Sequence, residues 1–180
     1  MAHATLPAVT DADHARGSAD AHIVLVQYGD FECPFARQVY EIVRDVQARF
    51  PGDVRLVFRH FPLRYHMNAL NAAIAAEAVA QASGVDAFWA YHDTLYANPL
   101  ALRPEHLVAY AEASGAPPEA VREALAEETH KAAVLAQKRS GVRAGVRSSL
   151  NLFIGGELFE DDDVEGAILS RVIEPLKAKE

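Results

Sequence analysis

The pattern of hydrophobic residues between positions 23 and 59 changes from that of a strand to that of a helix and back again. Residues 23–28 are a short apolar run rich in β-branched side chains, as expected for a buried strand. From residue 34 to 50 the apolar positions fall on one helical face, before a Pro-Gly pair ends the helix. Residues 54–59 form a second apolar, strand-like run. This order predicts a right-handed βαβ unit with parallel strands.

The rest of the chain is expected to add helices and then a second group of strands. Residues 68–141 are rich in alanine and are divided by Gly, Pro and Ser into four or five helices of ordinary length. A third strand is expected at residues 150–154, and Gly155-Gly156 predicts a hairpin turn into a short fourth strand at 157–159. Three aspartates at 161–163 precede a last amphipathic helix, and we interpret them as a helix cap rather than a metal site.

The balance of charges restricts the partners of this chain. With 17 Lys and Arg against 25 Asp and Glu, its formal net charge is −8 at pH 7. Such a charge argues against nucleic acid and against an anionic membrane, since both attract Lys and Arg. No apolar run approaches the ~20 residues that cross a bilayer, and residues 1–20 lack the basic start and apolar centre of a secretion signal. We therefore expect a cytoplasmic protein, or a periplasmic or extracytoplasmic one if a signal peptide was removed.

Cys33 is the only cysteine, so no intramolecular disulfide can form. It lies directly before Pro34, where the first strand passes into the helix. A thiol at this place is close to the free N–H groups and the positive dipole end of the first helical turn, which favour the nucleophilic thiolate. The neighbouring carboxylate of Glu32 would oppose this effect if it pointed inward. The alternative is that Cys33 is a small, buried apolar residue of the core.

Four segments resemble the DsbA-like family of thiol–disulfide oxidoreductases. Residues 27–35, Gln-Tyr-Gly-Asp-Phe-Glu-Cys-Pro-Phe, are similar to the family's active-site segment, in which a strand runs into Cys-Pro-aromatic-Cys. Residues 58–63 resemble the second strand and its exit, residues 88–96 a helix of the inserted helical domain, and residues 140–146 the approach to the third strand. The resemblance covers most of the chain and implies an α/β, thioredoxin-like fold with an all-helical insertion domain.

The resemblance also predicts how the chain is divided. Residues 1–19 are expected to be a flexible N-terminal segment. Residues 20–64 and 142–180 are expected to form the thioredoxin-like domain, and residues 65–141 the helical insertion. The insertion should bury its own apolar faces, because its helices are amphipathic and separately punctuated.

Two positions depart from the family pattern and limit the chemistry. Ala36 stands where the family has its second, resolving cysteine, and Leu150 where it has a cis-proline that faces the active-site cysteine. A chain with one cysteine has no disulfide to donate and cannot resolve a mixed disulfide by itself, which rules out dithiol oxidase activity. Without proline, we expect the Ser149–Leu150 peptide bond to be trans. Ala36 is either a natural divergence, which Leu150 favours, or an engineered Cys→Ala trap of a dithiol oxidoreductase.

Together these observations favour a monothiol thiol–disulfide exchange protein with Cys33 as the catalytic nucleophile. Its expected partners are protein thiols or small thiols, and a Cys33-linked homodimer is a further expected species. No bound cofactor is expected, although glutathione or another low-molecular-weight thiol can be the second reactant. The alternative is a redox-inactive DsbA-fold binding protein or chaperone. The expected substrate-binding positions are Pro34, Phe35, Ala36, Ser149 and Leu150.

The eight histidines show no metal-ligand pattern, because neither a His-x-x-x-His nor a Cys-x-x-Cys pair occurs. We therefore predict no metal site. A Cys–His hydrolase would need a histidine beside Cys33, and His60 at the end of the second strand is the one candidate. Arg59 is expected to be solvated or salt-bridged. The aromatic residues of the segment 88–96 are expected to pack in the core or between the domains, and they are Phe88, Trp89, Tyr91 and Tyr96.

Overall fold

The computed structural model describes residues 6–147, 152–159 and 163–178. The chain divides into two compact units. The first, called here the sheet unit, consists of Met1–Tyr28, Phe35–Arg59 and Ser140–Glu180. The second, called the helical unit, consists of Gly29–Pro34 and His60–Arg139. The segment that carries Cys33 therefore belongs to the helical unit, although the next helix along the chain belongs to the sheet unit.

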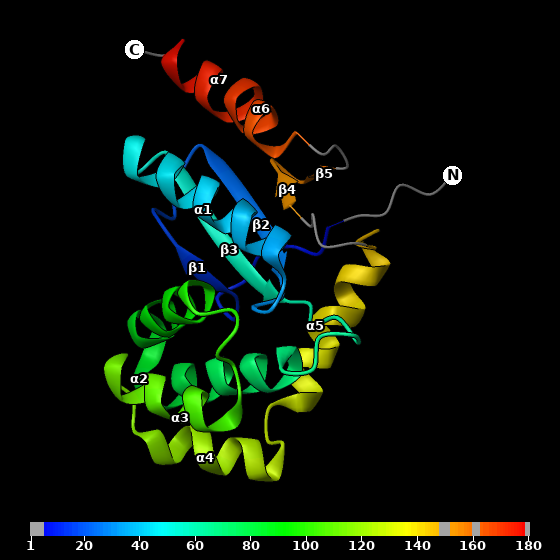
Figure 1. Cartoon of the computed structure of the whole chain (residues 1–180). Coiled ribbons are helices and arrows are strands. Elements are labelled where there is room, and N and C mark those ends of the chain that lie inside the picture. Colours follow the sequence, from blue (N-terminus) through cyan, green and yellow to red (C-terminus); the bar gives the residue numbers. More distant parts are fainter. Residues whose placement is uncertain (1–5, 148–151, 160–162, 179–180) are drawn as a thin grey trace. The chain divides into compact units, whose positions relative to one another are not determined.

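In the described part of the chain the strands form one sheet with the order β1-β3-β2-β4-β5 (Figure 1). Two of its inner strands, β2 (Ile23–Gly29) and β3 (Val54–His60), are those that the hydrophobic pattern predicted. They are neighbours in the sheet and are joined through a helix, so the strand–helix–strand unit is confirmed. Leu25 and Leu56, one on each strand, are completely buried and belong to the core.

The helix α1 (Pro34–Arg49) joins β2 to β3 and has the predicted amphipathic pattern. Pro34 occupies its first turn, where a missing N–H costs no helical hydrogen bond. The buried Gln27 side chain of β2 donates from Nε2 to the carbonyl oxygen of Ala36 at 2.8 Å, which ties the first turn of α1 to the sheet. The buried residues of α1 recur with a helical period and are Ala36, Val39, Tyr40, Val43 and Val46.

The N-terminal segment contains a strand that the sequence did not indicate. Within residues 1–19, expected to be flexible, β1 (His14–Arg16) pairs antiparallel with β3. Three residues are too few to leave a recognisable alternation, so periodicity could not reveal this strand. The preceding residue, Asp13, forms a buried ion pair with Arg59 of β3, with 2.7 Å between Oδ1 and Nε. The salt-bridged role expected for Arg59 is therefore confirmed.

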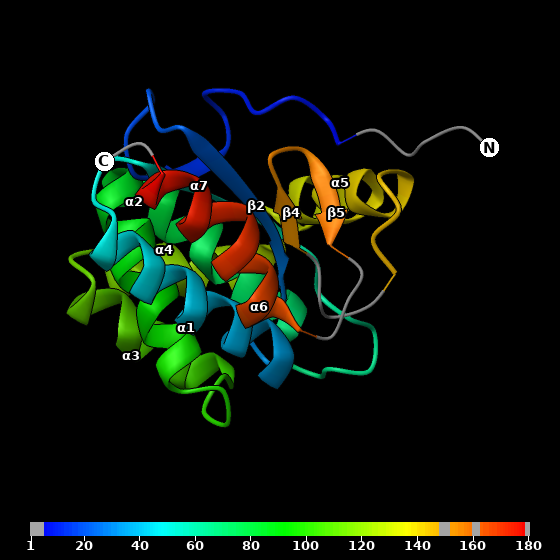
Figure 2. The same ribbon diagram turned by 90° about the horizontal axis from the view of Figure 1, so that it is seen from above.

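The predicted hairpin is present, with β4 (Leu152–Ile154) antiparallel to β5 (Glu157–Phe159). β4 also pairs with β2, and Figure 2 shows the hairpin alongside that strand. Gly155 and Gly156 both have positive φ, 59° and 90°. Glycine adopts this conformation without steric cost, which explains why the pair predicts the turn.

The last helix is present but contains a wider turn. It consists of α6 (Val164–Ile168), a π-helical turn (Leu169–Ile173) and α7 (Glu174–Lys177). Pro175 has no N–H, and its ring would clash with the carbonyl four residues earlier, so a π-turn before it accommodates the proline. Asp163 accepts a hydrogen bond from the Gly166 N–H at 2.8 Å and so acts as the expected cap. Asp161 and Asp162 lie outside the described residues.

The insertion contributes helices and no strand anywhere in residues 65–141, which confirms its predicted class. The predicted break at Ser83-Gly84 occurs inside α2, where Gly84 has φ 84° and ψ −174°. No helix within the described ranges is long and apolar enough to cross a membrane. The helices are α2 (Ala69–Ala97), α3 (Pro104–Ala113), α4 (Pro118–Glu127) and α5 (Lys131–Arg143).

The core of the helical unit is built around the aromatic residues of α2. Phe88 and Tyr91 are completely buried, as the sequence predicted. The Tyr91 hydroxyl donates to the carbonyl oxygen of Leu107 at 2.9 Å, which joins α2 to α3. Burial, with a smaller contribution from Tyr110, raises the pKa of the Tyr91 hydroxyl. The hydroxyl therefore stays protonated and serves as a hydrogen-bond donor.

The Cys33 loop as the candidate functional site

Cys33 lies near the end of the loop of residues 29–34, called here the Cys33 loop, between β2 and α1. Its thiol is free, and its backbone N–H donates to the carbonyl oxygen of Asp30 at 3.1 Å. Cys33 is only 2% exposed, which agrees with the alternative interpretation of a small, buried residue. Three other side chains of the loop, those of Asp30, Phe31 and Glu32, hold it against the rest of the helical unit.

Asp30 holds the loop through hydrogen bonds, and the sequence analysis did not identify this role. One carboxylate oxygen accepts a hydrogen bond from the Glu32 N–H at 2.8 Å, as in a turn in which an aspartate side chain bonds two residues ahead. The other accepts from the Leu63 N–H at 2.7 Å and lies 2.9 Å from Nδ1 of His66. The side chain is 3% exposed. The only local sign of this role was an aspartate that follows a strand and begins a loop. The other partners of Asp30, Leu63 and His66, lie more than 30 residues away in the sequence.

The Glu32 carboxylate is also held within the helical unit. It accepts hydrogen bonds from the Asn68 N–H at 2.8 Å and from Asn68 Nδ2 at 3.3 Å. Asn68 is the N-cap of α2, so the negative charge of Glu32 is stabilised by the start of that helix. The sequence left open whether this charge opposes a thiolate at Cys33. The structure shows that both of its oxygens have donors.

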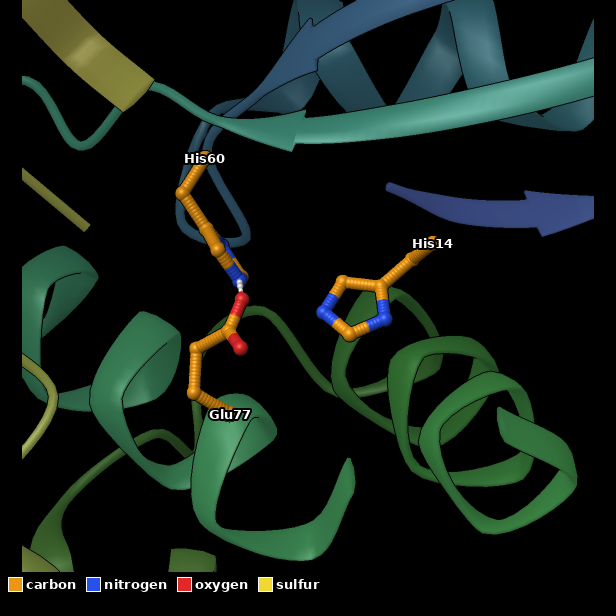
Figure 3. A group of neighbouring side chains, drawn as sticks. All are labelled: His14, His60 and Glu77. Carbon is orange, nitrogen blue, oxygen red and sulfur yellow. Dashed lines mark ion pairs between the residues drawn. The ribbon is translucent and has the colours of Figure 1, made fainter. Parts of the chain in front are cut away.

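Phe31 anchors the Cys33 loop in an aromatic cluster. Its ring centroid lies 5.9 Å from that of His60, 5.4 Å from that of His92 and 5.0 Å from that of Tyr96. His60 is completely buried, and its Nε2 lies 2.9 Å from Oε1 of Glu77 (Figure 3). These contacts give the candidate base of a Cys–His hydrolase a structural role, as a packed core histidine beside a carboxylate.

A basic side chain lies next to the segment that Asp30 holds. Lys138 of α5 donates from Nζ to the carbonyl oxygen of Pro62, and Nζ lies 5.6 Å from the ring centroid of Phe61. Burial and the repulsion of Arg64 lower the pKa of the Lys138 ammonium, against the attraction of Asp30. Lys138, Arg64 and Asp30 are therefore electrostatic neighbours.

The expected substrate-binding positions differ in accessibility. Pro34 is exposed, and Phe35 is 55% exposed, so both are available to a partner. Ala36 is 1% exposed and packs on the buried face of α1. Ser149 and Leu150 lie outside the described residues, and the trans bond expected between them stays a prediction.

A sheet with a helical insertion, and a cysteine at the start of the first helix after β2, define the class of thioredoxin-like proteins of the DsbA type. The sequence model of the thioredoxin family matches residues 9–174, and the chain belongs to this family.

Solved structures confirm the DsbA-like fold. BdbD from Bacillus subtilis has a TM-score of 0.81 at 22% identity and covers 92% of this chain and 93% of its own. MdbA, a thiol-disulfide oxidoreductase from Corynebacterium diphtheriae, has a TM-score of 0.71 at 20% identity and covers 96% of this chain and 95% of its own. The thioredoxin-like fold with a helical insertion was therefore predicted correctly.

Curated relatives carry the name of a different activity. The Na(+)/H(+) antiporter NhaA 1 of Salinispora arenicola is 36% identical over 152 residues, which is 84% of this chain and 23% of that protein. NhaA 1 of Mycolicibacterium vanbaalenii is 42% identical over 110 residues, 61% of this chain and 17% of that protein. The chain spans less than a quarter of the length of these relatives.

Proposed function

We propose that this protein is a monothiol thiol–disulfide exchange protein that reacts through Cys33. The observation that carries the proposal is the position of Cys33 directly before Pro34, the first residue of α1. A sulfur at the start of a helix is stabilised as the thiolate by the helix dipole and by N–H groups that lack helical partners. Membership of the thioredoxin family supports thiol chemistry at this loop.

The charges around the loop are compatible with a thiolate. Asp30 and Glu32 are the carboxylates closest to Cys33 in the sequence, and an uncompensated negative charge there would oppose its ionisation. Both carboxylates accept hydrogen bonds, at 2.7 Å from the Leu63 N–H and at 2.8 Å from the Asn68 N–H. Their charge is thus partly neutralised by donors within the helical unit.

The reaction is a single exchange. The Cys33 thiolate attacks one sulfur of a substrate disulfide, a new S–S bond forms as the old one breaks, and the leaving thiolate takes a proton from water. One disulfide is consumed for the one formed, so no net oxidation occurs. An external thiol then attacks the mixed disulfide and returns Cys33 to its free form. Ala36 supplies no thiol for an internal release.

The burial of Cys33 restricts the substrate. At 2% exposure, its sulfur is reached by a narrow, flexible group more easily than by the flat surface of a folded protein. Low-molecular-weight disulfides and extended peptide segments satisfy this requirement. The exposed Pro34 and Phe35 are expected to contact such a substrate.

The direct test is incubation of the native protein with oxidised glutathione, followed by intact-mass measurement. We expect one glutathionyl group on Cys33, its removal by added reduced thiol, and no adduct on the matched Cys33→Ser variant. A minor Cys33-linked homodimer is expected at high protein concentration. Incubated with a reduced, unfolded substrate and no added disulfide, the protein should introduce no bonds. A native protein that stays unmodified, while the urea-unfolded chain gains the adduct, would overturn the proposal.

A second candidate function is favoured by the curated relatives. Their names and the short share of their length that this chain spans suggest a binding domain that accompanies a Na(+)/H(+) antiporter. In that case the thiol is dispensable. In cells that carry both proteins, Cys33→Ser would then leave antiport unchanged, whereas deletion of this domain would alter it. The exchange proposal predicts instead that Cys33→Ser and the deletion have the same effect.

A further inference from the structure

The charges of this chain are strongly segregated along its sequence. Residues 54–76 and 129–156 contain 8 of the 17 Lys and Arg and none of the 25 Asp and Glu. The remaining residues carry 9 basic and all 25 acidic side chains. Two segments of positive charge therefore occur in a chain whose net charge is −8. An acidic partner repelled by the rest of the surface can approach at these segments.

The two acid-free segments meet beside the Cys33 loop. Lys138 belongs to the second segment, and its Nζ donates to the carbonyl oxygen of Pro62 in the first. Arg64, two residues after Pro62, is exposed and acts on Lys138 electrostatically. Leu63, which lies between Pro62 and Arg64, donates from its N–H to the carboxylate of Asp30 in the Cys33 loop at 2.7 Å. The two cations thus lie near each other and next to the segment that Asp30 of the Cys33 loop binds, within one unit of the protein.

Residues 64–67 of the same segment also expose apolar groups. Tyr65 is 73% exposed and Met67 is 90% exposed, although both are large and hydrophobic. The backbone is held on both sides of them, by a hydrogen bond from the Leu63 N–H to Asp30 and by one from the Asn68 N–H to Glu32. The side chain of His66 also contacts Asp30 through Nδ1, at 2.9 Å. Exposed aromatic and Met side chains on a fixed backbone are typical of protein-binding surfaces, since little order is lost when a partner binds.

We propose that residues 64–67 together with Lys138, called here the basic rim, recognise an acidic polypeptide segment whose cysteine is held in a disulfide. Cys33 attacks the sulfur of that cysteine, and the thiol on the other side of the disulfide leaves. This inference rests on the proposed exchange function and adds its substrate class. Arg64 and Lys138 pair with carboxylates that flank the substrate cysteine, while Tyr65 and Met67 contact apolar side chains of the same segment. A polypeptide supplies both kinds of group within a few residues.

The test uses three short peptides, each with one cysteine activated as a 2-thiopyridyl disulfide and flanked by Glu, Gln or Lys. Cys33 attacks the peptide sulfur, the peptide–pyridyl S–S bond breaks, and 2-thiopyridone is released and followed by its absorbance. We expect the rate to follow the order Glu, Gln, Lys, changing about threefold for each peptide charge within about 7 Å of a cation. The differences should shrink as salt is added, because ions screen exposed charges.

Arg64→Glu should reverse the order of the three peptides, and Tyr65→Ser should slow all of them without changing the order. Arg103→Glu, which makes the same charge change at the exposed start of α3, is the matched control and should leave the order unchanged. Equal rates for all peptides, insensitive to salt, would overturn the inference and leave the exchange function intact. No reaction with any peptide, while the unfolded chain reacts, would overturn both. If Arg103→Glu changed the order of the peptides as much as Arg64→Glu, the charge preference would follow from net charge alone. The basic rim would then be rejected as the binding site.

Discussion

The buried ion pair of Asp13 and Arg59 should make the sheet unit sensitive to the loss of either partner. Arg59 Nε donates to Asp13 Oδ1 at 2.7 Å and Nη2 to Oδ2 at 2.9 Å, a bidentate arrangement. The two side chains are 6% and 11% exposed. Arg59 also donates to the Tyr28 hydroxyl at 3.1 Å and to the carbonyl oxygens of Pro7 and Ala8 at 3.1 and 3.0 Å. Asp13 is the only charged partner among these acceptors.

Asp13→Ala should therefore leave a buried guanidinium without a counter-charge. Breaking a buried pair in this way costs about 3–5 kcal/mol. We expect the lower end, about 3 kcal/mol, because Tyr28 and the two carbonyls still accept hydrogen bonds from Arg59. For a chain of this size, that corresponds to a fall in Tm of roughly 6–12 °C.

The assay is urea unfolding followed by circular dichroism, on the wild type, Asp13→Ala and Arg37→Ala. Arg37 forms an exposed pair with Glu41, at 39% and 45% exposure, and its loss should cost less than about 1 kcal/mol. A cost for Asp13→Ala no greater than for Arg37→Ala would refute the assignment of Arg59 as a buried clamp.

The same variant has a predicted dependence on pH. Burial acts to raise the pKa of Asp13, but hydrogen bonds from Arg59 and Thr10 and the charge of Arg59 outweigh it, and the pKa lies below 3.8. A lowered folded-state pKa means that the stabilisation is fully present above the unfolded-state pKa and is lost as the pH falls through the folded-state pKa. The stability difference between wild type and Asp13→Ala should therefore be constant near neutral pH and shrink in acid. A difference that grows in acid would contradict this sign.

Three further substitutions test other parts of the account. Asp30→Ala should cost about 1–3 kcal/mol and alter the reaction rate of Cys33, since it leaves two part-buried N–H groups without their acceptor. Unfolding and thiol-labelling measurements check the two effects. Gly17→Ala should cost at least about 1 kcal/mol, because Gly17 has φ +105° and an added Cβ would lie 2.6 Å from the Val54 carbonyl oxygen; urea unfolding would show a cost near zero if this is wrong. Tyr91→Phe should lower stability by about 1 kcal/mol through the lost bond to Leu107, with thiol reactivity unchanged.

The parts of the fold that the sequence predicts are those with long or strongly punctuated patterns. The run of residues 23–28 and the face of α1 were recognisable because many residues repeat with one period. Gly155-Gly156 marked the hairpin because positive φ favours glycine. β1 has only three residues and left no such signal. The π-turn before Pro175 depends on how a single proline is accommodated within an otherwise regular helical pattern.

The sequence predicts where the candidate site lies in the chain, but it does not predict which residues surround the cysteine. Cys33 before Pro34 is visible in the sequence, because a strand and a helix meet there. Its 2% exposure is not visible, and neither are the contacts of its loop. Asp30 binds Leu63, 33 residues away, and Glu32 binds Asn68, 36 residues away. Contacts of this kind follow from the tertiary fold and leave no local pattern.

The central claim is that the fold makes Cys33 a reactive monothiol. The most direct measurement compares the rate at which Cys33 reacts with oxidised glutathione at pH 6 in the native and in the urea-unfolded chain. An unfolded thiol, with a pKa of about 8.5, is less than about 1% ionised at this pH, so stabilisation of the thiolate has its largest effect there. The account predicts a faster reaction in the native chain, which Cys33→Ser abolishes. A native chain that reacts no faster than the unfolded one at any pH between 5 and 8 would contradict it.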